Sequence, residues 1–220
     1  MMRIKAERMK KTIKRIDSGA KLIIATLLIG AFVSCASTKI DKVWSDPSYK
    51  EKPIASVMIV GVAKNDKDVA YYEDTLQGEF AKAGILAYSG NLAIPASDMD
   101  DEQSKKAHLK RIKEAAVKNK VQAVLITAVI SVKEWETVKD TLGRSMNYFY
   151  DGLTHASWGP SGPNDMSTTE IRLLTAIFDV EKEQLIWQAT YQTNDPVSAR
   201  SLVKNVSNTL VKQLKKDGVI

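Results

Sequence analysis

The apolar and polar positions along the chain divide it into one long uncharged run, followed by alternating strand-like and helix-like stretches. Residues 55–63 (ASVMIVGVA) and 122–132 (QAVLITAVISV) are almost continuously apolar and rich in β-branched residues, which is typical of strands buried on both faces. Shorter strand patterns cover residues 85–94, 170–180 and 185–193. Because only a short turn separates the last two, we expect them to form an antiparallel hairpin.

Apolar residues at three- and four-residue spacing predict three helices. The first covers residues 69–83, the second covers residues 97–120, and the third opens at Asp195 and Pro196. Gly218 follows the last apolar position of the third helix, where a C-terminal cap is expected. The predicted order is therefore strand, helix, strand, helix, three strands and a final helix.

This order predicts a single α/β domain over residues 54–220, with a mixed sheet of about five strands in two or three layers. Residues 35–53 read as an extended tether, because prolines are frequent there and disfavour a helix. Residues 141–168 form a long connection with many glycines and prolines and no periodicity of their own. A connection of that length is usually functional or mobile.

The long uncharged run lies at residues 22–33, after eight Lys and Arg residues. A basic segment followed by an apolar run of this length is the pattern of a bacterial export signal. As a helix the run would reach about 18 Å, well short of a hydrocarbon core of about 30 Å, so a permanent span is disfavoured. Either Met1 or Met9 fits as the true start.

The run ends in Phe32, Val33, Ser34 and Cys35, which resemble the lipobox of bacterial lipoproteins, although Phe32 replaces the favoured Leu. The resemblance implies that residues 1–34 are a signal peptide and that Cys35 is lipidated after cleavage. Ala36 is not the Asp that retains many lipoproteins in the inner membrane, which favours the outer membrane, facing the periplasm, in a Gram-negative bacterium. The alternative is that Cys35, the only cysteine, simply ends an ordinary signal peptide or anchor helix.

Charge argues against nucleic-acid binding. The chain has 32 Lys and Arg residues against 26 Asp and Glu residues. Residues 1–34 hold eight of the bases and two of the acids, so 24 of each remain and the mature domain is formally neutral. A nucleic-acid surface needs a basic excess, and here that excess belongs to the export signal.

The sequence contains no recognisable catalytic or metal-binding motif. Its only histidines are His108 and His155, and it lacks a second cysteine and the HExxH and GxSxG patterns. We therefore predict no cofactor, no metal site and no catalytic residue. His108 lies among lysines on a predicted helix and is expected to be a solvated surface residue.

One segment of the long connection is unusually aromatic. Residues 148–158 read YFYDGLTHASW. Exposed aromatic residues on loops are enriched at protein interfaces, so this segment is the candidate partner-binding site. Its members are Tyr148, Phe149, Tyr150, His155 and Trp158. The alternative is that the aromatic side chains fold back over an open face of the sheet.

The lipobox, the runs SVMIVGVA and AVLITAVISV, and IFDVEKEQLIWQATYQT followed by DP and a terminal helix together resemble a group of uncharacterised bacterial outer-membrane lipoproteins. Their α/β domain is similar to the TolB amino-terminal domain and to the periplasmic domain of CsgG. The resemblance covers about residues 35–220 and concerns fold rather than chemistry. It does not extend to pore formation, because the chain lacks the alternating lipid-facing hairpins of a barrel.

From the sequence we expect one of two functions. The favoured one is a non-enzymatic, lipid-anchored periplasmic module that binds a protein partner in the cell envelope. The alternative is an envelope hydrolase or small-ligand-binding lipoprotein that uses residues 141–167 as a lid over carboxylates such as Asp151 and Asp165.

Overall fold

The computed structural model describes residues 38–49, 53–63, 66–90, 102–130, 170–194, 196 and 198–220. They form a mixed α/β domain with a six-stranded sheet and three helices. The strands are β1 (Thr38–Ser45), β2 (Ser56–Val62), β3 (Leu86–Ser89), β4 (Ala123–Ile130), β5 (Glu170–Asp179) and β6 (Leu185–Asn194). The helices are α2 (Asp66–Lys82), α3 (Glu102–Lys118) and α6 (Ala199–Lys216).

The strand order in the sheet is β1-β6-β5-β4-β2-β3. The two most apolar strands are neighbours: β2 pairs in parallel with β4, with Val57 opposite Ala123. β3 adds to the other side of β2, also in parallel. The remaining pairs, β4 with β5, β5 with β6 and β6 with β1, are antiparallel. The sheet therefore combines a parallel half and an antiparallel half.

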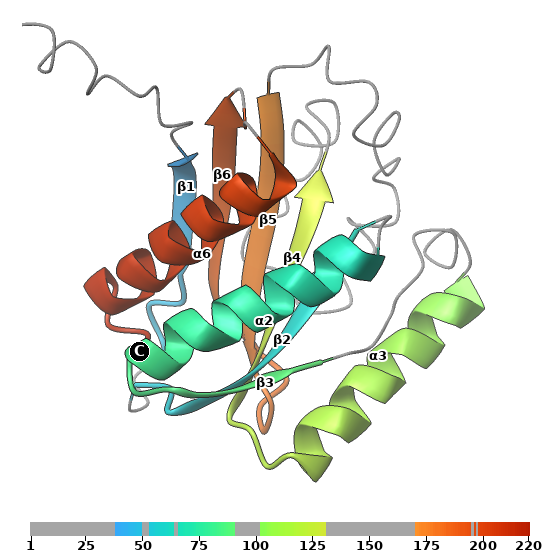
Figure 1. Cartoon of the computed structure of the whole chain (residues 1–220). Coiled ribbons are helices and arrows are strands. Elements are labelled where there is room, and N and C mark those ends of the chain that lie inside the picture. Colours follow the sequence, from blue (N-terminus) through green and yellow to red (C-terminus); the bar gives the residue numbers. More distant parts are fainter. Residues whose placement is uncertain are drawn as a thin grey trace, which may run out of the picture. The chain divides into compact units, whose positions relative to one another are not determined.

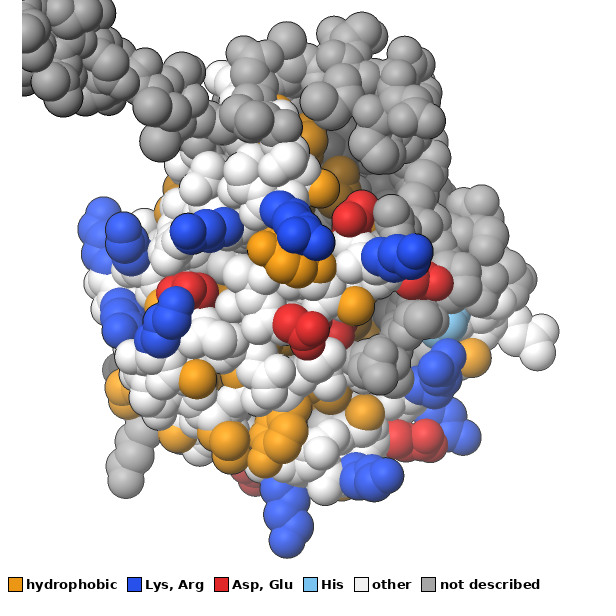
Figure 2. All heavy atoms as spheres, viewed as in Figure 1, with side chains coloured by type: hydrophobic (Ala, Val, Ile, Leu, Met, Phe, Trp, Pro, Cys, Tyr) orange, Lys and Arg blue, Asp and Glu red, His pale blue; other side chains and the backbone are white. Residues whose placement is uncertain are grey.

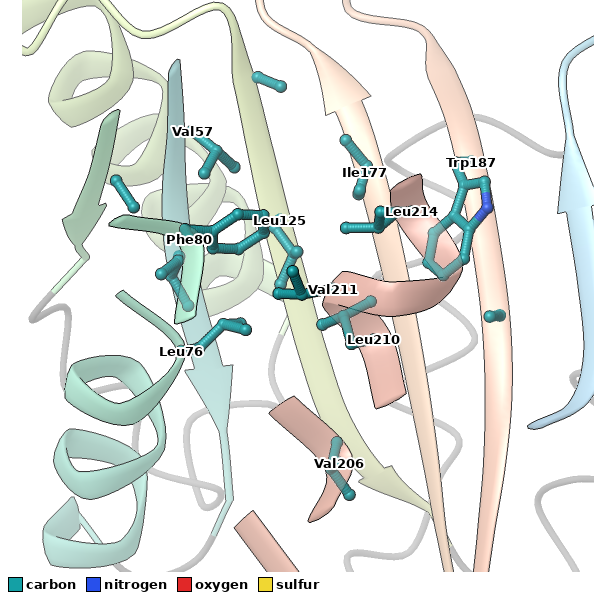
Figure 3. Close-up of a cluster of buried hydrophobic side chains, with 14 of the residues drawn as sticks. Val57, Leu76, Phe80, Leu125, Ile177, Trp187, Val206, Leu210, Val211 and Leu214 are labelled. Atoms are coloured by element: carbon teal, nitrogen blue, oxygen red, sulfur yellow. The ribbon is translucent and has the colours of Figure 1, made fainter. Parts of the chain in front are cut away.

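Helices cover both faces of the sheet (Figure 1). α2 and α6 pack side by side on one face, and their apolar side chains meet those of the strands there. In Figure 3, Leu125 of β4 and Val211 of α6 lie between Leu76 and Phe80 of α2 on one side and Leu210 and Leu214 of α6 on the other. On the other face, Ile112 and Ala116 of α3 are fully buried against β2, β4 and β5. The strands at the centre are buried on both faces, as their apolar runs predict.

Specific residues define the ends of α6. Ser198 is the N-cap: its side chain accepts a hydrogen bond from the Ser201 amide, and the Ser201 hydroxyl accepts one from the Ser198 amide. This reciprocal pair satisfies two amides that the helix itself leaves unpaired. At the other end, Gly218 has a φ of 71°, a left-handed conformation that glycine adopts without strain. The cap at Gly218 is confirmed.

The structure confirms the predicted α/β class and the order of elements from β2 to α6. It also corrects the predicted tether. Thr38–Ser45, within the segment 35–53 assigned to the tether, is β1, and it pairs with β6 as an edge strand of the sheet. The extended conformation was predicted, but the pairing was not. The reason is that five of the eight residues of β1 remain exposed, so the apolar pattern that identifies a strand is weak.

The prediction that His108 is a solvated surface residue is wrong. Its side chain is only 6% exposed. His108 precedes Ile112 by four residues and Ala116 by eight, so all three lie on the same face of α3. The neighbouring lysines suggested exposure, but the helical spacing places His108 on the buried stripe.

Candidate functional site

The site residues predicted from the sequence lie outside the described part of the chain. These are the lipidation site Cys35 and the candidate partner-binding residues Tyr148, Phe149, Tyr150, His155 and Trp158. The carboxylates of the alternative hydrolase, Asp151 and Asp165, also lie outside it. All of these assignments stay predictions.

The described strands nevertheless show where those segments join the domain. β1 begins at Thr38, which pairs with Thr193 near the end of β6. β5 begins at Glu170, which pairs with Asn194, and β4 ends at Ile130, which pairs with Arg172 of β5. These strand ends therefore lie at one end of the sheet, which we call the Thr38 end. Both the segment that contains Cys35 and the segment 131–169 join the domain there.

A row of three buried hydroxyl groups runs across the sheet, from α2 to β4 and β5. The Tyr72 hydroxyl of α2 lies 2.6 Å from Oγ1 of Thr127 on β4, which in turn lies 2.8 Å from Oγ1 of Thr175 on β5. All three side chains are less than 10% exposed. These hydroxyl contacts link α2 to two strands of the sheet within a largely apolar core.

Burial keeps the phenols of this region neutral. Desolvation raises the pKa of Tyr72 well above the ordinary value, against a smaller opposing effect of the hydrogen bond with Thr127. Desolvation also raises the pKa of Tyr191 on β6. The Tyr191 hydroxyl lies near Thr175, but it makes no hydrogen bond of ordinary geometry with any described residue. These phenols act as neutral polar groups at physiological pH.

Glu73 supplies a buried carboxylate next to Tyr72. Its side chain is 1% exposed. One carboxylate oxygen accepts a hydrogen bond from the Gly61 amide of β2 at 2.9 Å, and the other accepts one from the Ser89 hydroxyl of β3 at 2.5 Å. Glu73 therefore ties α2 to the carboxyl ends of two parallel strands. In open α/β sheets, ligand sites are commonly found at the carboxyl ends of the parallel strands.

The burial of Glu73 was not predicted from the sequence. A usable signal was present, because Glu73 lies three residues before Leu76 and seven before Phe80, on the buried stripe of α2. A charged residue at such a position requires partners. The partners come from Gly61 and Ser89, which are distant in sequence, so the hydrogen bonds themselves could not be predicted from the local pattern.

At the opposite end of the sheet, the residues after β1 contact the β5–β6 turn. The Tyr49 hydroxyl donates a hydrogen bond to Asp179 at 3.3 Å, and the Lys182 ammonium lies 5.6 Å from the centre of the Tyr49 ring. Asp46 accepts hydrogen bonds from Ser48 and from Gln184, and those from Ser48 contribute most to lowering the pKa of the Asp46 carboxyl. These contacts fasten the end of β1 to the domain.

The two edges of the sheet are poor templates for an added strand. β1 carries Lys39, Asp41 and Lys42, and its register shifts between Ile40 and Lys42. Charged side chains and bulges are the usual protection of an edge strand. The other edge strand, β3, has only four residues. Neither edge therefore favours extension of the sheet by an added strand.

Charge is unevenly distributed over this neutral domain. Residues 102–120, which include α3, contain seven Lys and Arg residues and two Glu residues. An open hollow on α3 is lined by Lys106, Leu109, Lys110, Lys113 and Glu114. On the face formed by α2 and α6, by contrast, basic and acidic side chains are interspersed (Figure 2). α6 is as basic as α3, with five Lys and Arg residues and no Asp or Glu, whereas α2 has two Lys residues against five Asp and Glu residues.

Within the described ranges, no group of three or more His, Cys, Asp or Glu residues is arranged to hold a metal ion. No helix of the same ranges is both long enough and apolar enough to cross a membrane.

Comparisons with known proteins add little to this picture. No protein-family model and no curated protein matches the sequence. Two similar solved structures are dodecamers of PelC from Paraburkholderia phytofirmans, each with 14% sequence identity. The first match covers 79% of this chain and 95% of that chain with a TM-score of 0.41. The second covers 80% and 94% with a TM-score of 0.36. Similarities this distant carry no argument about what this chain does.

Proposed function

We propose that this protein is a lipid-anchored module of the bacterial cell envelope, attached to the outer membrane through Cys35 and acting by binding a protein partner rather than by catalysis. The observation that carries the proposal is the sequence Phe32-Val33-Ser34-Cys35 directly after a basic segment and a twelve-residue apolar run. Several acyl chains on one residue hold a protein far more firmly than the marginal, reversible binding that a single chain provides. Such a domain would stay at the membrane without a spanning helix.

The described domain is compatible with this role in two respects. Its first strand begins three residues after Cys35, so a folded domain follows the proposed anchor directly. Its edge strands are short or charged, which favours recognition through side chains and suppresses uncontrolled strand pairing at a crowded membrane surface.

The partner-binding residues that we propose are the aromatic ones of residues 148–158, together with His155. To test them, Tyr148, Phe149 and Trp158 are changed to Ala together, and partners are captured by crosslinking in the native envelope. Loss of a crosslinked partner with unchanged stability supports the assignment. An unchanged partner set with reduced stability means instead that these side chains belong to the core.

The anchor is tested separately with a radiolabelled fatty acid. Cells that produce the full chain are compared with cells that produce the Cys35→Ala variant. We expect label on the unaltered protein and none on the variant, because Cys35 is the only cysteine. Equal label on both proteins contradicts the proposal.

A further inference from the structure

The distance between Cys35 and the folded domain is limited by covalent geometry. Only residues 36 and 37 lie between Cys35 and Thr38, the first residue of β1. An extended chain spans at most about 3.6 Å per residue, so the Cα atoms of Cys35 and Thr38 lie within about 11 Å of each other. This limit holds whatever conformation the intervening residues adopt.

β1 adds no flexible length between Cys35 and the sheet, because it pairs with β6 from its first residue, Thr38. The Thr38 and Thr193 hydroxyl groups lie 2.8 Å apart, and the Lys42 amide donates to the Thr190 hydroxyl at 3.2 Å. Ile40 packs against the core cluster on the α2 and α6 face. To move away from the proposed anchor, the domain would have to detach an entire strand.

We infer that the Thr38 end of the sheet docks on the membrane surface, and that the lipid headgroups are its partner. This inference rests on the proposed lipidation of Cys35. A lipidated cysteine lies at the level of the headgroups, so a strand that starts within about 11 Å of it begins at the membrane surface. Lys39 and Arg200, near the starts of β1 and α6, are exposed and supply positive charge at this end, and the Arg200 guanidinium lies 5.5 Å from the centre of the Tyr71 ring.

The same constraint directs the opposite end of the sheet away from the membrane. β6 has ten residues, which corresponds to about 30 Å at roughly 3.3 Å per residue. α6 returns along the sheet, because Asp217, just past its end, contacts Trp187 near the start of β6. The β5–β6 turn and the end of α6 therefore face away from the membrane, towards the periplasm.

The docking is tested with the full-length, lipidated protein in vesicles of phosphatidylethanolamine and phosphatidylglycerol that contain a headgroup spin label. Single cysteines are introduced by Asn194→Cys at the Thr38 end and by Glu181→Cys in the β5–β6 turn. Both positions are exposed, and each receives the same fluorophore. Mass spectrometry of the same samples verifies fatty acid on Cys35. A control protein carries twelve inserted Gly and Ser residues before Thr38, a flexible linker of about 20 Å.

We expect severalfold stronger quenching at position 194 than at position 181, and a smaller difference in the protein with the inserted linker. Equal quenching at both positions in acylated protein overturns the docking while the anchor stands. Stronger quenching at position 181 overturns it as well. Absence of fatty acid on Cys35 overturns both the docking and the proposed function, and the mass spectrum reveals this independently of the fluorescence.

Discussion

The indole Nε1 of Trp187 donates a hydrogen bond of 2.9 Å to the carboxylate of Asp217. Trp187 lies on β6 and is fully buried, whereas Asp217 is the C-cap of α6. The bond therefore joins the end of the last helix to the sheet. Gln213 donates a second hydrogen bond to the same carboxylate at 2.8 Å, and the Val219 carbonyl accepts one from the Ile54 amide at 2.8 Å. Together these contacts hold the C-terminus against the start of β2.

We expect Asp217→Ala to lower the free energy of unfolding by about 1–3 kcal/mol, because the buried indole N–H of Trp187 loses its acceptor. Urea denaturation of the domain followed by circular dichroism measures the change. Asp74→Ala is the control: Asp74 is exposed on α2, and its removal should change stability by less than about 0.5 kcal/mol. Equal effects of the two substitutions would show that the bond to Trp187 contributes nothing.

The row of buried hydroxyl groups predicts a non-additive pair of substitutions. Thr127→Val leaves the buried Tyr72 hydroxyl without this partner and should cost about 1–3 kcal/mol. Tyr72→Phe in the same background removes the stranded hydroxyl as well, so the double variant should be more stable than the sum of the two single effects predicts. A double-mutant cycle by urea denaturation measures the coupling. Strict additivity would mean that the two hydroxyl groups do not interact.

Two glycines should respond in opposite directions to alanine. A Cβ at Gly90 would lie 2.7 Å from the Ile59 carbonyl oxygen, which also accepts the Gly90 amide hydrogen bond, so Gly90→Ala should destabilise the domain. A Cβ at Gly78, exposed in the middle of α2, meets nothing within 4 Å. Gly78→Ala should stabilise the domain by about 0.5–1 kcal/mol. Thermal unfolding of both variants tests the prediction, and a shift of the same sign in both contradicts it.

Alkaline pH should destabilise the domain through its buried phenols. Burial raises the folded-state pKa of Tyr72 and Tyr191, so both phenols stay protonated while those of the unfolded chain ionise near pH 10. The free energy of unfolding is therefore unaffected by these phenols below about pH 10. Above pH 10 it falls by up to about 1.4 kcal/mol per pH unit for each phenol.

Urea denaturation between pH 8 and 11 measures this slope. Tyr72→Phe should make the decline above pH 10 shallower, because it removes one of the two buried phenols. An identical slope in Tyr72→Phe would show that Tyr72 ionises normally in the folded state.

The apolar pattern was sufficient to predict most of the fold. β2 and β4 are buried on both faces, so their sequences are unambiguous, and the buried positions Val203, Val206 and Leu210 of α6 repeat at helical spacing. β1 was missed because its stability comes from pairing with β6 rather than from an apolar face of its own.

The buried polar side chains could not be predicted from the local sequence pattern, because partners such as those of Glu73 come from other strands. His108 and Glu73 lie on the buried stripes of their helices, but the lysines beside His108 suggested exposure and no prediction was made for Glu73. Glu73 is buried because β2 and β3 supply the Gly61 amide and the Ser89 hydroxyl, which only the folded sheet brings together. The predicted sites at Cys35 and residues 148–158 lie outside the described residues, so they stay predictions.

The central claim is that Cys35 becomes the lipidated N-terminus of the mature protein. Mass spectrometry of the N-terminal peptide from protein purified out of its native envelope tests it most directly. The account predicts a peptide that begins at Cys35 and carries a diacylglyceryl group and an acyl group, with residues 1–34 absent. A peptide containing an unmodified Cys35, or a mature chain that still carries residues 1–34, would contradict it.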